Sequence, residues 1–232
     1  MPSPNPLFQA LLWSSATIAV YVAAKRVHQR WPLTLTSPLV LTPCVLFLVV
    51  AITHEQYRDY FAATHWLGLL LGPAMVSFAI PIFERRELVR RHWPALVAGV
   101  AAGSLLAVTT AWGLSSLLGL SDVLRLSMLS RSISTPFAVA VSHDIGGVPE
   151  MTALFVIVTG LMGASLGQLL LHWLPLRSAL ARGALFGMGA HSVGVAAASR
   201  LGGEEGAVAG LVMIFAGLSN VVLAPLLFWL MH

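Results

Sequence analysis

The sequence predicts an all-α integral membrane protein that crosses the bilayer several times. Its 232 residues are 57% hydrophobic and only 9% charged, whereas soluble domains are nearer a quarter charged. The apolar stretches are long and continuous rather than alternating, which indicates spanning helices rather than a barrel. The net charge of +4 would suggest nucleic acid in a soluble protein. Here the basic residues stand between apolar stretches, so they are expected to orient the chain in a lipid bilayer, with no nucleic-acid partner.

The first part of the chain contains four expected spans, at residues 7–24, 31–53, 60–83 and 93–118. The N-terminus lacks a basic region, so the first span is interpreted as retained rather than as a signal peptide. Basic residues cluster at 25–30 and 84–91, two spans apart and therefore on one side of the membrane. The positive-inside rule puts that side in the cytoplasm. We therefore expect a multi-pass protein of the bacterial inner membrane with its N-terminus outside.

The second part combines two short segments with two long ones. Residues 126–142 and 183–199 are short and interrupted by Gly and Ser. At about 1.5 Å per residue, each would barely cross a core about 30 Å thick. Residues 151–174 and 206–231 are long apolar spans. The sequence does not decide whether the short segments cross the membrane or re-enter it. The expected number of spans is therefore about six to eight. The expected domains are an N-terminal four-helix membrane region, 1–125, and a C-terminal region, 126–232.

A broken helix is predicted around residues 131–147. Pro136 lacks an N–H and disfavours helical geometry at Thr135. The hydroxyls of Ser132, Ser134 and Thr135 could cap the freed backbone groups. Gly146 and Gly147 are expected to end the segment through positive φ. A second structural break is expected at Gly72 and Pro73, inside the third span.

A weak internal repeat supports a second broken helix. Residues 135–143 align with 192–200, and both stretches run into a glycine pair, an acidic residue and a long apolar span. Few positions are identical, so chance is the alternative. Paired broken helices at corresponding positions are the best sequence-level indication of a transporter site.

Eight short stretches of the chain carry recognisable motifs: 70–74, 79–81, 131–138, 145–149, 152–160, 181–183, 189–191 and 204–207. Together they resemble the LrgB/CidB family of membrane proteins, from about residue 7 to 231. The resemblance implies antiholin-like control of murein hydrolase export and autolysis, or a kinship with the plastid glycolate/glycerate translocator and with pyruvate uptake. It also implies a small LrgA/CidA-like membrane partner. The chain departs from the family pattern at Ala190, Val195 and Ala197, which puts its substrate specificity in doubt.

The candidate substrate-binding residues lie at the two breaks. They offer hydroxyl donors, backbone N–H groups, one guanidinium and one imidazole, which suit a carboxylate. Arg131 is alternatively an interfacial anchor, and His191 is alternatively an interhelical hydrogen-bonding group. The predicted set is Arg131, Ser132, Ser134, Thr135, Pro136, His191, Ser192 and Gly194.

Three residues are candidates for proton coupling: His191, Asp144 and His143. Intramembrane ionisable groups are functional candidates, and histidine titrates near neutral pH. His143 and Asp144 are alternatively loop residues at the membrane edge. Glu204 and Glu205 are expected to cap the last helix, where negative charge is favourable.

No metal site, cofactor or enzyme motif is expected. The histidines are dispersed, and paired catalytic carboxylates and phosphate-binding loops are absent.

Two functions remain. The first is a transporter or facilitator of small monocarboxylates such as glycolate, glycerate or pyruvate, with or without coupling to protons. The alternative is a holin/antiholin-like regulator. Small residues in spans 93–118 and 151–174 favour a homo-oligomer, with a dimer as first choice.

Overall fold

The computed structural model describes residues 6–31, 36–53 and 56–231. All regular structure in these residues is helical, as predicted. The chain divides into two compact units, Met1–Ala74 and Met75–His232. The predicted boundary at residue 125 falls inside the second unit, and the two-domain division at that point stays a prediction.

The first unit contains α1 (Pro6–Arg30), α2 (Pro38–Thr53), α3 (Tyr57–Thr64) and the 3-10 helix η2 (His65–Leu70). Trp66 donates its indole N–H to Ser14 Oγ at 2.8 Å, and Trp13 packs edge-on against Tyr60. These contacts hold α1 to the segment that carries α3 and η2. Gly72 and Pro73, where a break was expected, lie in the first turn of α4 (Leu71–Ser77), directly after the change from η2 to α4.

In the second unit, α5 (Ala79–Glu84) leads into α6 (Arg86–Leu117). α6 is kinked at His92, whose φ of −118° and ψ of 15° are not helical. Pro94 explains the kink, because a proline in a helix interior removes one hydrogen bond and crowds the preceding turn. The first turns of α6 therefore point in a different direction from the rest.

The segment that was expected to contain the first break is a helical hairpin, here called the first hairpin. Its limbs are α7 (Asp122–Leu129) and α8 (Thr135–Asp144), and its tip is 130–134. Thr152 Oγ1 lies within hydrogen-bond distance of both Ser142 Oγ, at 2.7 Å, and the Ser127 carbonyl, at 3.0 Å. Ser127 and Ser142 can meet one side chain only if α8 runs back alongside α7, because 15 helical residues in line would span about 22 Å.

The second short segment also doubles back, within α10 (Ala179–Leu201). His191 has φ 39° and ψ −124°, which interrupts the helix. A Cβ built on Gly194 would lie 2.0 Å from the Phe186 carbonyl oxygen, although eight residues of straight helix span about 12 Å. Residues 179–190 and 192–201 are therefore the two limbs of a second hairpin with His191 at its tip. The open question about residues 183–199 is answered in favour of a segment that turns back.

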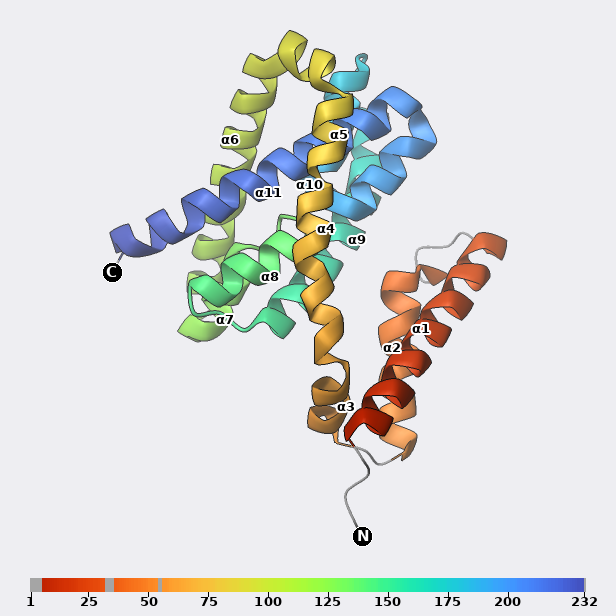
Figure 1. The fold of residues 1–232 in the computed structure, drawn as a ribbon. Helices are drawn as coiled ribbons and strands as arrows, with labels where there is room; N and C mark the ends of the chain where they lie inside the picture. Colours follow the sequence, from red (N-terminus) through yellow and green to blue (C-terminus); the bar gives the residue numbers. More distant parts are fainter. Residues whose placement is uncertain (1–5, 32–35, 54–55, 232) are drawn as a thin grey trace. The chain divides into compact units, whose positions relative to one another are not determined.

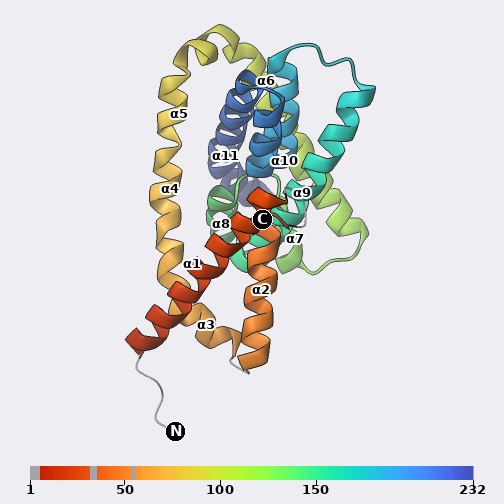
Figure 2. The ribbon, with the colours of Figure 1, turned by 90° about the vertical axis from the view of Figure 1, so that its right-hand side faces the viewer.

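Each hairpin is followed by a long helix, α9 (Pro149–Trp173) and α11 (Gly203–Met231). The two hairpins approach α9 from its opposite ends. Thr152, near its start, contacts the base of the first hairpin, whereas Gly167 faces Phe186 in the second hairpin. Figures 1 and 2 both show α10 beside α11. The order hairpin, long helix, hairpin, long helix agrees with the expected repeat, and each second limb begins where the sequence alignment begins.

Five helical segments in the described residues are long and apolar enough to cross a membrane: Pro6–Arg30, Tyr57–Glu84, Arg86–Leu117, Pro149–Trp173 and Gly203–Leu223. α2 is a shorter apolar helix. The chain is therefore a multi-pass membrane protein. The core of the second unit joins Phe137 and Ile133 of the first hairpin to Val208 and Val212 of α11.

Candidate functional site

The tip of the first hairpin presents the beginning of α8. Ser134 is the N-cap of α8, yet its side chain makes no capping hydrogen bond. The expectation that Ser134 caps the break is therefore wrong, and its buried Oγ has no partner in the described part of the chain. Arg131 Nη1 donates to Ser132 Oγ at 3.2 Å. The first N–H groups of α8 lack intrahelical partners, as at any helix start.

The tip of the second hairpin is His191 itself. Among the described residues it is the one non-glycine residue with positive φ. Backbone strain of this kind costs about 1–3 kcal/mol and is concentrated at functional sites. The second limb starts at Ser192, so its free N–H groups also lie at the tip. Ser192 is exposed, whereas Gly194 is buried.

The two tips are neighbours, because the backbone of Arg131 lies beside the imidazole of His191. The contact does not satisfy the imidazole. His191 is only 1% exposed, and neither ring nitrogen has a hydrogen-bond partner of good geometry within the described residues. A buried polar group without a partner costs about 1–3 kcal/mol. His191 and Ser134 therefore supply three polar atoms whose hydrogen bonds a ligand or water would complete.

Glycines fix the position of the second tip. A Cβ on Gly160 would lie 2.7 Å from His191 Cε1, and a Cβ on Gly163 would lie 2.0 Å from the Gly189 carbonyl oxygen. Only glycine allows α9 and α10 to approach so closely. The small residues of span 151–174, which were expected to favour a dimer, therefore pack α9 against α10 within one chain. Homodimerisation stays a prediction.

The electrostatics at the tips favour an anion. Two helix N-termini, each with a partial positive charge, begin at neighbouring points. The guanidinium of Arg131 is half-buried, and the ion pairs in the described residues do not include it. Its charge is therefore available to a carboxylate, which Arg binds through two parallel hydrogen bonds. Thr135 and Pro136, also half-buried, form the first turn beside it.

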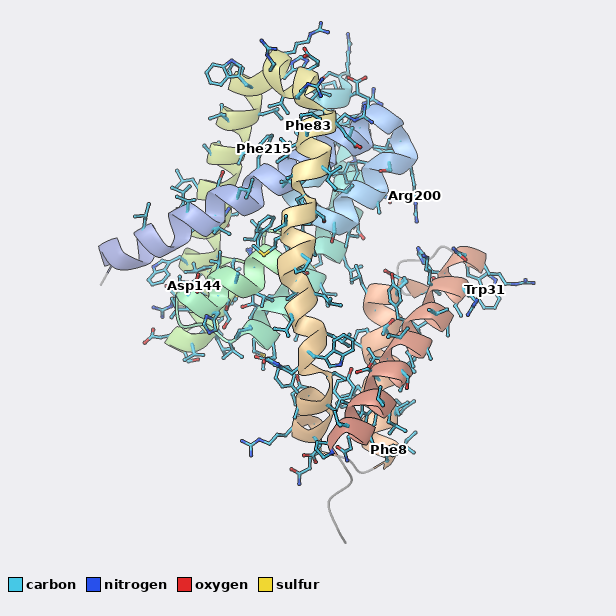
Figure 3. All side chains as sticks on the ribbon, in the orientation of Figure 1. Phe8, Trp31, Phe83, Asp144, Arg200 and Phe215 are labelled. Atoms are coloured by element: carbon cyan, nitrogen blue, oxygen red, sulfur yellow. The ribbon has the colours of Figure 1, made fainter. Side chains whose placement is uncertain are left out.

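His143 and Asp144 lie elsewhere. They form an exposed pair at 3.4 Å at the far end of α8, nine residues or about 14 Å from Thr135. Gly146 has φ 82°, which confirms the predicted helix end, and a Cβ on Gly147 would meet Ser142 Oγ at 2.5 Å. Figure 3 shows Asp144 and Arg200, one near the base of each hairpin, well apart.

Several contacts were not predicted from the sequence. Ser127 Oγ accepts the Val148 N–H at 2.8 Å, and Ser130 Oγ donates to the Ala138 carbonyl at 3.1 Å. Arg182 and Glu205 form an ion pair at 3.6 Å across the base of the second hairpin. A single serine in an apolar helix does not indicate, from the sequence, which group it will hydrogen-bond. The acidic first turn of α11 was expected. Asn220 of α11 donates to Ser104 Oγ of α6 at 3.1 Å and so joins these two helices.

Comparisons with known proteins cover nearly the whole chain. Residues 17–230 match the model of the LrgB-like family. The chain is 35% identical to the uncharacterized protein YwbG of Bacillus subtilis, over 91% of this chain and 94% of that protein. It is 31% identical to the holin-like protein CidB of Staphylococcus aureus, over 98% of this chain and all of that protein. No solved structure matches.

Proposed function

The chain belongs to the LrgB-like family, and we propose that it transports small organic anions across the membrane. The substrates are monocarboxylates of the glycolate, glycerate, pyruvate or lactate type. The carboxylate binds between the two hairpin tips. Arg131 supplies charge, while Ser134, Thr135 and the backbone N–H groups of both second limbs donate hydrogen bonds.

The proposal rests on the convergence of two helix N-termini on buried polar atoms that have no hydrogen-bond partner among the described residues. Gly160, which faces His191, is 11 residues from the start of α9 and 13 from its end. At about 1.5 Å per residue the tips therefore lie about 16 Å and 20 Å from the two ends. This is near the middle of a bilayer, where transporters with inverted repeats bind their substrates.

The hairpins also support a six-span topology with both termini outside. If neither hairpin crosses, the spans are α1, α2, 57–84, α6, α9 and α11. Of the 13 Lys and Arg residues, ten then lie on the cytoplasmic side; Arg58, Arg125 and Arg131 do not. That bias supports placement in an inner membrane with the N-terminus outside.

The test is uptake of labelled monocarboxylates into proteoliposomes, comparing Arg131→Gln with Arg200→Gln. Arg200 is an exposed arginine at the base of the second hairpin. Removing a guanidinium that pairs with a carboxylate is expected to raise the apparent KM at least about tenfold, since such bonds contribute about 1.5–3 kcal/mol. Arg200→Gln should leave uptake near wild type. Equal behaviour of the two variants, or no uptake of any monocarboxylate by the wild type, would exclude the proposed site.

The second candidate is a holin/antiholin-like role in murein hydrolase export and autolysis, in which a small LrgA/CidA-like membrane protein would be the partner. It is supported by the holin-like relative CidB, which aligns over its full length. The two functions differ in what crosses the membrane. A holin-like pore would release a large uncharged dye from vesicles, whereas a carrier would move the monocarboxylate and retain the dye.

A further inference from the structure

A concave feature whose lining includes none of the hairpin-tip residues lies between α6 and α11. It is a groove of about 260 Å³. α6 contributes Val89, Trp93 and Ala101 among others, and α11 contributes Phe215, Ser219 and Leu223. Figure 3 labels Phe215 on α11. The three α11 residues are spaced by four and form one stripe. The lining is apolar except for Ser219, so the groove itself offers little to a soluble anion.

One end of the groove adjoins a cationic rim. Arg85, Arg86, Arg90 and Arg91 are all exposed, and with Glu84 and Glu87 they give this segment a net charge of 4 − 2 = +2. Arg86 lies three residues before Val89, on the same face of the helix. Arg90 pairs with Glu87 at 4.0 Å, but both side chains are 81% exposed, so this pair competes weakly with another anion.

We propose that the groove binds one acyl chain of an anionic phospholipid, whose phosphate is held by Arg86 and Arg90. A zwitterionic lipid offers the same phosphate but no net negative charge to the rim, and a free phosphate would not use the groove. Arginine binds phosphate oxygens bidentately. The kink at His92 separates the arginine-bearing turns from the membrane-crossing part of α6. Trp93, 59% exposed, stands at that change of direction, as aromatic residues do at membrane interfaces.

The dimensions fit one leaflet. Beyond the kink, the α6 side of the groove runs from Trp93 to Ala101, eight residues or about 12 Å. Half of a hydrocarbon core about 30 Å thick is about 15 Å. The rim belongs to the loop that the charge bias puts in the cytoplasm, where anionic lipids attract basic residues.

The test uses the full chain purified in a neutral detergent. Native mass spectrometry would measure retention of phosphatidylglycerol and of phosphatidylcholine with identical acyl chains. We expect preferential retention of phosphatidylglycerol by the wild type. Each surface arginine is expected to contribute about fivefold, so Arg86→Gln with Arg90→Gln should reduce the preference about 25-fold. The matched control is Arg26→Gln with Arg30→Gln, which should not change it.

The groove is tested separately by filling it. Ala101→Leu adds bulk inside the groove and should abolish retention, whereas Ala102→Leu, outside the groove, should not. Ser219→Leu fills the groove from α11 and replaces Ala101→Leu if that variant aggregates. Equal retention of the two lipids would overturn the proposal. So would unchanged retention in both groove-filling variants, or equal displacement by soluble glycerol phosphate. A dimer that dissociates in Ala101→Leu with no change in lipid retention would instead identify a second copy of the chain as the occupant.

Discussion

Gly194→Ala adds one methyl group at the narrowest point of the second hairpin. The new Cβ would lie 2.0 Å from the Phe186 carbonyl oxygen and 3.0 Å from Ala190 Cβ. Ordinary contact begins at 3.4 Å, so the deficit is 3.4 − 2.0 = 1.4 Å. The obstructing atom belongs to the backbone and cannot rotate away. The limbs must therefore separate, and the N–H groups that follow His191 move with them.

The expected destabilisation is about 1–3 kcal/mol, as for other overpacked interiors. For a chain of this size that lowers the melting temperature by roughly 2–12 °C. Uptake of the monocarboxylate should fall more than tenfold, because a shift of about 1 Å exceeds the tolerance of a hydrogen bond. The assays are thermal unfolding in detergent, followed by intrinsic fluorescence, and initial uptake into proteoliposomes.

Gly189→Ala is the matched control, two residues before the tip. A Cβ there has nothing within 4 Å, and alanine is the better helix former. We therefore expect unchanged uptake and equal or slightly higher stability. If Gly194→Ala melted and transported like Gly189→Ala, the limbs of α10 would not be packed back to back, and the hairpin interpretation would be refuted.

Thr135→Val keeps the side-chain shape but removes the hydroxyl, so uptake should fall about tenfold with an unchanged melting temperature; wild-type uptake would count against a site at this tip. Uptake at a fixed concentration of ionised substrate should rise as external pH falls from about 7.5 to about 5.5, a range that brackets the ordinary histidine pKa of about 6.5. The reason is that an imidazolium and a bound carboxylate stabilise each other. His191→Gln should flatten that profile, and an unchanged profile would leave His191 structural. Glu205→Gln leaves Arg182 without its partner and should lower stability by about 1 kcal/mol; additivity with Arg182→Gln in a double-mutant cycle would show that the pair contributes nothing. Light scattering in mild detergent and in nanodiscs should give the mass of a homodimer, and a monomer in both would refute it.

The all-α membrane class was predictable because long uncharged apolar stretches in a protein usually form membrane-spanning helices. The breaks were predictable at Pro136 and Gly146, where missing N–H groups and positive φ leave a signature in residue type. The direction of the chain after each break was not predictable. A proline or a glycine permits a reversal as readily as a kink, and contacts such as Gly194 with Phe186 decide between them.

The candidate site was predictable in part. Arg131 and His191 stand out as ionisable groups in apolar surroundings, yet nothing in their spacing of 60 residues indicates that they are neighbours. That proximity depends on two hairpins of matched length that enter from opposite ends of α9. The lack of a capping bond at Ser134 was also invisible, because serine is a normal N-cap residue and its rotamer is set by packing.

The meeting of the two tips near the middle of α9 has an electrical consequence. If aqueous vestibules reach the tips from both sides, most of the transmembrane voltage falls across the short region between Ser134 and His191. One elementary charge moved through 100 mV changes the free energy by about 2.3 kcal/mol. An inward-moving carboxylate would climb nearly all of that gradient within a few ångströms. A proton carried on the same step would cancel the charge, and transport would then be independent of the membrane potential.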